Sequence, residues 1–192
     1  MTAASHKHSI ADELKGIAGL IAVIWIAFGV SQLVDINQYG LQPRTSTGWV
    51  GIATSPFLHA DMAHITGNSL PLLVLLCLLA GSRANSGKVV FAIVVVGGGL
   101  HFLLGRHGNH IGASGLVFGL VAFLILSGIL ERRFLPLLVS VVTLVLYGGT
   151  LLSGVLPTVG DHISWDGHLC SAVAGGLIAW RTARDSQGGT ME

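Results

Sequence analysis

Apolar residues run along this chain in long, unbroken stretches that short polar links separate. A helix needs about 20 consecutive apolar residues to cross the hydrocarbon core of a bilayer. Stretches of about this length predict six membrane spans, near residues 16–34, 64–81, 88–105, 113–130, 134–156 and 164–180. Because lipid offers no hydrogen-bond partners, only helices or a closed barrel can cross it, and unbroken apolar runs favour helices. We therefore expect an all-α, polytopic bundle of six transmembrane helices.

The composition agrees with a protein that has the lipid bilayer as its solvent. Hydrophobic residues make up 52% of the 192 residues, charged residues 10%, and the mean hydropathy is +0.75, whereas soluble domains are about a quarter charged. The net charge is +1, and the basic residues flank the predicted spans without forming a patch. Nucleic-acid binding is therefore excluded.

Basic residues predict the orientation in the membrane. If the six spans alternate, eight basic residues fall on one side, and only Arg44 and Arg106 fall on the other. The eight are Lys7, Lys15, Arg83, Lys88, Arg132, Arg133, Arg181 and Arg184. The positive-inside rule then places both termini in the cytoplasm and the heads of the second, fourth and sixth spans on the outer side.

The expected organisation is one membrane domain with two polar ends. Residues 1–15 form a cytoplasmic leader without a clear cleavage site, so the first span is expected to be retained rather than removed as a signal peptide. Residues 16–180 form the membrane domain, and residues 181–192 a polar, disordered cytoplasmic tail. The longest link, residues 35–63, is expected to lie partly in the outer leaflet through Trp49, Phe57 and Leu58.

Two residues able to form an activated nucleophile stand at the heads of two spans. Ser114 lies in Gly112-Ala113-Ser114-Gly115, and His168 begins the last apolar segment. Polar groups at membrane depth are costly and are candidates for function. An imidazole within hydrogen-bond reach can take the serine proton and return it to a leaving amine. Ser114 and His168 therefore predict a catalytic dyad.

Small and aromatic residues after Ser114 suit a helix pair that supports this dyad. Gly115 and Gly119 stand four residues apart and permit another helix to approach closely. Phe118 lies one turn after Ser114, so its ring is expected on the same face, where it either packs in the core or holds the imidazole.

Two further side chains predict an oxyanion hole. His64 and Asn68 are four residues apart at the head of the second span and share a helix face. Acyl transfer needs hydrogen-bond donors where the oxyanion forms. Asn68 is the stronger candidate and His64 the second.

A catalytic acid, a metal site and a disulfide are not expected. Asp161 and Asp166 precede the sixth span and are able to orient His168, but we expect both to face water, which favours a dyad over a triad. Histidines are abundant on the outer side, yet there is no His-Glu-x-x-His pair and no carboxylate among the spans, so no metal or other cofactor is predicted. Cys77 and Cys170 are expected to be buried, inert thiols.

In three ordered motifs the chain resembles the rhomboid intramembrane serine proteases over residues 16–180. The motifs are His59-x-x-x-x-His64-x-x-x-Asn68, Gly112-Ala113-Ser114-Gly115, and Gly167-His168 with Gly175 seven residues later. The resemblance implies the six-helix rhomboid core, Ser114 as nucleophile and His168 as general base. It also implies an oxyanion hole of His64, Asn68 and the Ser114 N–H, a water-filled cavity, and single-span membrane proteins as substrates.

The chain departs from the family pattern at two positions. Ser171 replaces a common glycine three residues after the histidine, and Phe118 replaces a frequent tyrosine. Both replacements keep a similar size, and neither removes a catalytic group.

The sequence therefore predicts an intramembrane serine endopeptidase that works through an acyl-enzyme. Family analogy suggests a bacterial cytoplasmic membrane, with the active site opening to the outer side. One alternative is a non-catalytic rhomboid-like scaffold that binds transmembrane helices, and a second is a small histidine-rich transporter or metal carrier. No short motif encodes the substrate or the oligomeric state.

Overall fold

The protein is a bundle of long helices. The computed structural model describes residues 9–83, 85–157 and 163–188, and within them it contains no strand, only an isolated bridge between Leu41 and His110. The long helices are α1 (Ile10–Ser31), α3 (Met62–Ser82), α4 (Ser86–Leu104), α5 (Ser114–Glu131), α6 (Phe134–Gly154) and α7 (Trp165–Gly188). Between α1 and α3 lie the short α2 (Gly51–Thr54) and the 3-10 turns η1 (Asn37–Tyr39), η2 (Gly48–Val50) and η3 (Ser55–Phe57).

Each predicted span corresponds to one long helix, but only five of these helices are long and apolar enough to cross a membrane. They are α1, α3, α4, α5 and α6. The 24-residue α7 is not among them, because its second half carries charged side chains such as Arg181 and Arg184. The prediction of six spans is thus confirmed for five.

The helix ends differ from the predicted ends of the membrane domain. The first helix begins at Ile10, inside the expected leader, where Ser9 caps it by accepting the Asp12 N–H. The last helix continues past Trp180 to Gly188. The prediction of a disordered tail over residues 181–192 is therefore wrong for residues 181–188, because these polar residues extend the same helix; residues 189–192 lie outside the described residues.

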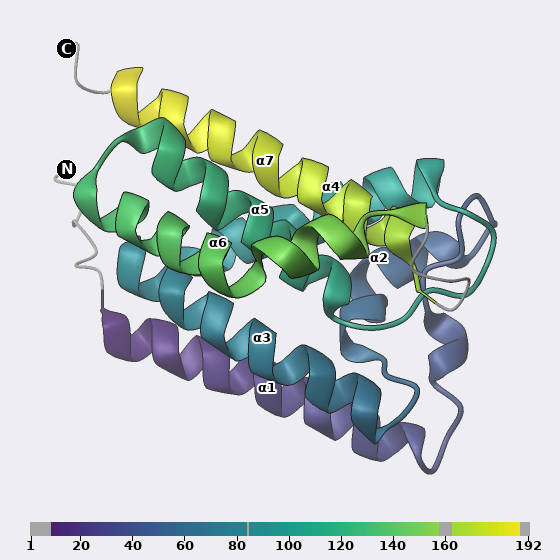
Figure 1. Ribbon diagram of the computed structural model, residues 1–192. Helices are drawn as coiled ribbons and strands as arrows, with labels where there is room; N and C mark the ends of the chain where they lie inside the picture. The colour runs from purple at the N-terminus through teal and green to yellow at the C-terminus, as the bar shows by residue number, and fades with distance from the viewer. Residues whose placement is uncertain (1–8, 84, 158–162, 189–192) are drawn as a thin grey trace, which may run out of the picture.

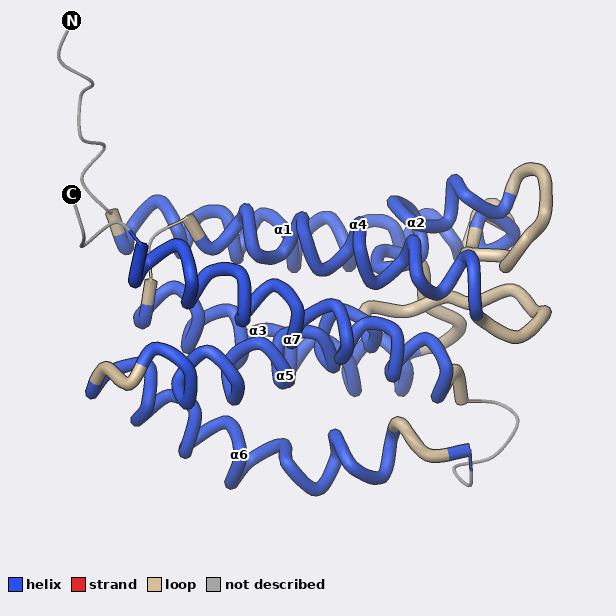
Figure 2. Tube along the Cα trace, turned by 90° about the horizontal axis from the view of Figure 1, so that it is seen from above, coloured by secondary structure: helices blue, strands red, loops and turns tan. Residues whose placement is uncertain are grey.

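The long helices run alternately up and down the bundle, so the start of α1 and the end of α7 lie at the same end (Figure 1). The central helix is α5, which packs against α3, α4, α6 and α7. Of the 18 residues in the most apolar stretch of α5, 61% are buried, whereas the corresponding share in α1, at the edge of the bundle, is 17%. The view from above shows α5 beside α7, with α1 and α6 on opposite sides of the bundle (Figure 2). A helix surrounded by others is a fixed platform for a site at its N-terminus.

The connection between α1 and α3 is folded against the protein. Leu41 and Leu58 are 2% and 5% exposed, and α2 packs on α4. Gly51 has no space for a side chain, because a Cβ there would overlap the Leu41 backbone. Trp49 is 60% exposed. Leu58, which we expected at the membrane–water boundary together with Trp49, lies instead in the protein interior.

Candidate active site

The N-terminal ends of α5 and α7 bring Ser114 and His168 together. The Ser114 Oγ lies 2.9 Å from the His168 Nε2, a hydrogen-bonding distance. Small residues allow this approach. A Cβ at Gly175 would overlap the backbone of Gly119, and a Cβ at Gly115 would lie 3.1 Å from the Ser171 Oγ. The close packing of another helix on Gly115 and Gly119 agrees with the sequence-based expectation, and Ser171 fits where the family often has glycine.

The second ring nitrogen of His168 determines the tautomer. The His168 Nδ1 lies 3.0 Å from the Gly154 carbonyl oxygen at the end of α6. A carbonyl oxygen only accepts hydrogen bonds, so Nδ1 carries the proton and donates it. Nε2 then presents a lone pair to the Ser114 hydroxyl. Neutral His168 is therefore oriented to act as a base without a carboxylate.

Phe118 holds the imidazole from one side. Its ring stacks on the His168 ring with centroids 4.0 Å apart and planes 5° from parallel. Phe118 is 6% exposed, and its ring also fills the space beside Gly154, where a Cβ would overlap it. The ring is thus both a packed core aromatic and a support for His168, the two roles that the sequence left open.

His64 and Asn68 direct nitrogen atoms toward the backbone that precedes Ser114. Gly112 has a φ of +117°, and a Cβ there would lie 2.5 Å from the His64 Nε2 and 3.4 Å from the Asn68 Nδ2. The His64 Nδ1 accepts the Ala60 N–H at 3.4 Å, so its proton is on Nε2. The buried Asn68 Nδ2 has no hydrogen-bond partner within the described residues. Both side chains therefore have an N–H free to donate at this point.

Local structure explains why His64 and Asn68 share this face. Asp61 caps α3 by accepting the His64 N–H at 2.8 Å, which begins the helix just before His64. One turn later Asn68 lies above His64 on the same side, as the spacing predicted.

His59 secures the loop before the nucleophile. It is fully buried, its Nε2 accepts the Ala113 N–H at 3.4 Å, and its ring meets the His64 ring edge-on at 5.0 Å. Burial, followed by the nearby His64, lowers the pKa of His59 to about 4. The sequence motif contained His59 but assigned it no role, and the neutral ring acts as a hydrogen-bond acceptor for this loop.

A cavity opens above the dyad. Its empty volume is about 500 Å³, including the part open to solvent, and Ser114 and His168 line it together with apolar side chains of the α1–α3 connection and α4. The same cavity reaches His101 and His110. Water therefore has access to the Ser114 hydroxyl.

The prediction that Asp166 faces water is wrong. Asp166 is 6% exposed, and its Oδ2 accepts the Arg106 N–H at 2.6 Å. It does not bond the His168 ring, whose Nδ1 is occupied by Gly154. Asp161, the other proposed orienting acid, lies outside the described residues, as does His162.

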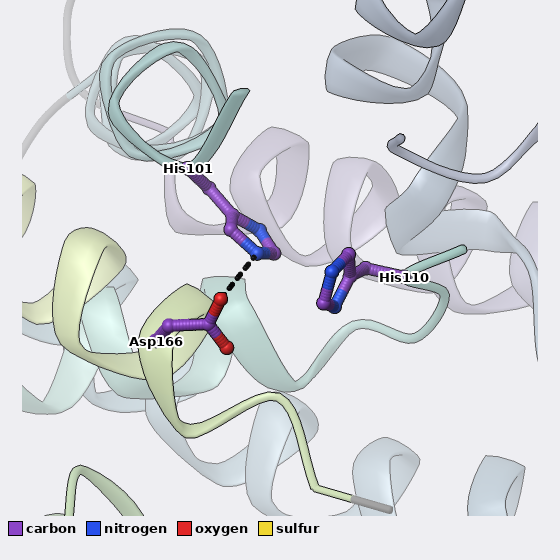
Figure 3. Close-up of side chains that lie close together, drawn as sticks. All are labelled: His101, His110 and Asp166. Carbon is purple, nitrogen blue, oxygen red and sulfur yellow. Dashed lines mark ion pairs between the residues drawn. The ribbon is translucent and has the colours of Figure 1, made fainter. Parts of the chain in front are cut away.

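Sequence reasoning missed a second polar cluster in which a buried carboxylate meets two histidines. One ring nitrogen each of His101 and His110 and one oxygen of Asp166 lie within 4.8 Å of one another (Figure 3). These residues are far apart along the chain. We expected no carboxylate beside the outer histidines because we expected Asp166 to face water. No pattern in the sequence marks the cluster.

The cysteines are unpaired. Cys77 is exposed on the surface of α3, and Cys170 is half-buried in α7. The prediction that both are buried is therefore wrong for Cys77, whose side chain points away from the bundle.

Comparisons with known proteins identify the family. The family model of the Rhomboid domain matches residues 46–185. An uncharacterized protein of Mycobacterium tuberculosis is 36% identical over 177 residues, covering 85% of this chain and 72% of its own length. An uncharacterized protein of Mycobacterium leprae is 40% identical over 176 residues, covering 85% of this chain and 69% of its own length. No solved structure gives a significant match.

Proposed function

This chain belongs to the rhomboid family of integral membrane proteins, and from that premise we propose that it is an intramembrane serine endopeptidase. Its substrates are single-span membrane proteins, cleaved within or near their transmembrane segments. One observation carries the proposal: the Ser114 hydroxyl lies 2.9 Å from the unprotonated nitrogen of His168. The alternative is a non-catalytic scaffold that binds transmembrane helices, for which this hydrogen bond would have no use.

Catalysis begins with proton transfer inside the dyad. The Ser114 Oγ attacks the scissile carbonyl carbon while the His168 Nε2 takes the hydroxyl proton. The Gly154 carbonyl, which accepts from the His168 Nδ1 at 3.0 Å, stabilises the resulting imidazolium and keeps the ring in place. The imidazolium then returns the proton to the departing amine, which leaves an ester on Ser114. A water molecule then attacks the ester while the His168 Nε2 takes its proton, and the imidazolium returns that proton to the Ser114 Oγ as the carboxylic acid product leaves.

The oxyanion of each tetrahedral intermediate would form beside Gly112. Three donors serve it: the Asn68 Nδ2, the His64 Nε2–H and the Ser114 backbone N–H. The Ser114 N–H belongs to the first turn of α5, where N–H groups have no acceptor within the helix. Donors fixed before the reaction stabilise the developing charge most strongly where water is scarce.

The shape of the site suits a locally unwound substrate. A peptide bond within a regular helix is shielded, so a substrate segment must open before Ser114 can reach its carbonyl carbon. A helix with its side chains is about 10–12 Å wide, too large for the cavity at Ser114, so the substrate would have to enter as an extended segment. Small or helix-breaking residues near the scissile bond are therefore the expected substrate feature, and no cofactor is required.

We propose the topology that the basic residues predict. Arg83 and Arg132 directly follow α3 and α5, and Lys88 lies in the first turn of α4, whereas Ser114 and His168 lie in the first turns of α5 and α7, at the opposite ends of these helices. With both termini in the cytoplasm, α7 would be the sixth span of a domain covering residues 16–180, and the cavity would open to the outer side. A bacterial cytoplasmic membrane is the proposed location.

The test compares the wild-type protein with Ser114→Ala and His168→Ala variants, purified in mild detergent. Cleavage of a fluorescent single-span substrate is followed with and without chelator, and Ser153→Ala, at an exposed serine near the end of α6, is the matched control. We expect activity in the wild type and the control, loss in both dyad variants, and no effect of chelator. Equal cleavage by all variants would refute the dyad. If no substrate is cleaved and no serine-directed phosphonate labels Ser114, the scaffold alternative replaces the protease.

A further inference from the structure

His101, His110 and Asp166 form a compact group beside the cavity, and each comes from a different part of the fold. His101 lies in the last turn of α4, His110 in the loop before α5, and Asp166 in the first turn of α7. The two imidazole rings meet edge-on with centroids 4.4 Å apart, and the His101 Nε2 lies 3.5 Å from the Asp166 Oδ2. Figure 3 shows the ion pair between His101 and Asp166, with the His110 ring beside it. Three potential ligand atoms thus converge within 4.8 Å.

We propose that these three side chains bind a divalent transition-metal ion, with Zn²⁺ as the natural occupant. Two imidazole nitrogens and one carboxylate oxygen are a ligand set that Zn²⁺ and Co²⁺ both accept, and a water molecule completes such a shell. Hard ions such as Mg²⁺ and Ca²⁺ prefer sites made of oxygen ligands. The site is separate from the dyad, because none of its ligands takes part in the proton transfer between Ser114 and His168.

The unsatisfied nitrogen of His101 is the first argument for this site. The His101 side chain is 9% exposed, and its Nε2 is buried and makes no hydrogen bond. A buried polar atom without a partner costs free energy, about 1–3 kcal/mol, and is uncommon in folded proteins. The polar group that faces this nitrogen is the Asp166 Oδ2, 3.5 Å away and without hydrogen-bonding geometry, which leaves the pair loosely connected. A metal ion satisfies this nitrogen.

The hydrogen bonds of His110 are the second argument. Its Nε2 lies 3.0 Å from the Arg106 carbonyl oxygen, which only accepts, so Nε2 carries the proton. The Nδ1 therefore presents a lone pair, which the Ser164 hydroxyl meets at 2.8 Å. Metal-binding histidines usually donate their other ring N–H to a carbonyl or carboxylate, which fixes the ring. His110 already has this arrangement.

The backbone on both sides holds His101 in place. A Cβ at Gly167 would lie 2.6 Å from the His101 Cε1, and a Cβ at Gly105 would lie 2.8 Å from its Nε2. Bonds of about 2.0–2.2 Å place the ligands of a tetrahedral ion closer together than 4.8 Å, so binding requires a small inward movement. His110 is half-buried in a loop and lines the cavity, which allows that movement and lets an ion enter.

Arg106 is the one cation in contact with the cluster among the described residues. Its Nη2 lies 3.4 Å from the Asp166 Oδ1, while the opposite oxygen, Oδ2, faces His101. The Oδ2 also accepts the Arg106 backbone N–H at 2.6 Å, and its second lone pair is the one available to an ion. The positive charge of Arg106 weakens the affinity for metal but leaves the ligand atom accessible.

The test measures metal binding directly. The full chain, with a histidine-free affinity tag, is stripped with chelator and titrated with Co²⁺, which gives visible absorption bands in a tetrahedral nitrogen and oxygen site. Ser114→Ala serves as the background, so that proteolysis plays no part. We expect saturable absorption that Zn²⁺ abolishes by competition, and a rise in the melting temperature with Zn²⁺, because an ion that binds only the folded protein stabilises it.

Two variants in the same loop decide the outcome. His110→Gln removes a ligand from a half-buried position, and His107→Gln changes an exposed histidine outside the cluster. His110→Gln should weaken Co²⁺ binding by at least about tenfold, the loss that follows even when an outer hydrogen-bonding partner of a ligand is removed. His107→Gln should bind Co²⁺ as tightly as the Ser114→Ala protein that carries no further change. Absence of saturable absorption, or equal binding by both variants, would overturn the site, and neither result depends on the protease activity.

Discussion

Replacing Gly175 by alanine tests whether helix packing sets the geometry of the dyad. The added Cβ would lie 2.9 Å from the Gly119 carbonyl carbon and 3.1 Å from the Phe123 nitrogen, and closer still to the Gly119 oxygen. Ordinary contact begins at 3.4 Å, and all three atoms belong to the α5 backbone. No side-chain rotation relieves the overlap, so α7 must move away from α5 by about 1 Å.

That movement acts directly on the reacting atoms. His168 lies two turns before Gly175 on α7, and its Nε2 is now 2.9 Å from the Ser114 Oγ. A displacement of about 1 Å takes this pair beyond hydrogen-bonding distance, and misplacement of that size costs roughly 100-fold in rate. The expected result is a fall of about 100-fold in kcat/KM, together with about 1–3 kcal/mol of lost stability from overpacking.

The assay compares Gly175→Ala with Gly176→Ala. Both changes add a methyl group to α7, but the Cβ at Gly176 meets only the end of the Leu126 side chain, at 3.0 Å, which can rotate away. Cleavage of the fluorescent substrate, phosphonate labelling of Ser114 and the melting temperature are measured for both. A Gly175→Ala protein that cleaves as fast as Gly176→Ala would refute the link between this contact and the dyad.

Two further changes probe the oxyanion hole and the loop before the nucleophile. Asn68→Ala removes a donor that has no other partner, so kcat should fall about 10²–10³-fold in the cleavage assay while KM changes little; a change confined to KM would instead indicate a role in substrate binding. The fold holds His59 neutral, with its pKa lowered from 6.5 to about 4, so the unfolded chain binds more protons between these values. The contribution of neutral His59 to the free energy of unfolding should therefore be fully present above about pH 6.5. It should be lost progressively toward pH 4, by up to about 3 kcal/mol. Melting temperatures should show a shallower fall for His59→Gln, which keeps an acceptor for the Ala113 N–H, and identical slopes would contradict this account.

Departures from the family pattern are accommodated by the contacts around the dyad. Ser171 packs where glycine is common. Its hydroxyl would lie only 3.1 Å from a Cβ at Gly115, so a side chain larger than serine at position 171 has no room beside α5. Phe118 lacks the hydroxyl of the frequent tyrosine, yet its ring stacks fully on His168. The support of the imidazole depends on the flat ring and not on a hydroxyl.

Long-range contacts explain what the sequence could not predict about the site. The heads of the second, fourth and sixth spans were identified from hydropathy, and spacing placed His64 and Asn68 on one face. The partner of the His168 Nδ1 is a backbone carbonyl, that of Gly154, and any residue type supplies the same carbonyl. The burial of Asp166 depends on the Arg106 N–H and on His101, which belong to other segments of the chain.

The sequence by itself determined the membrane class and the helices, because lipid leaves an apolar chain few ways to satisfy its backbone polar groups. It also determined the candidate nucleophile, base and oxyanion donors, since these depend on residue type and local spacing. Only the tertiary structure decided the distance between Ser114 and His168, the tautomer of His168 and the meeting of His101, His110 and Asp166. Those features arise where separate helices touch, and contacts between distant segments depend on shape and packing rather than on a local pattern of residues.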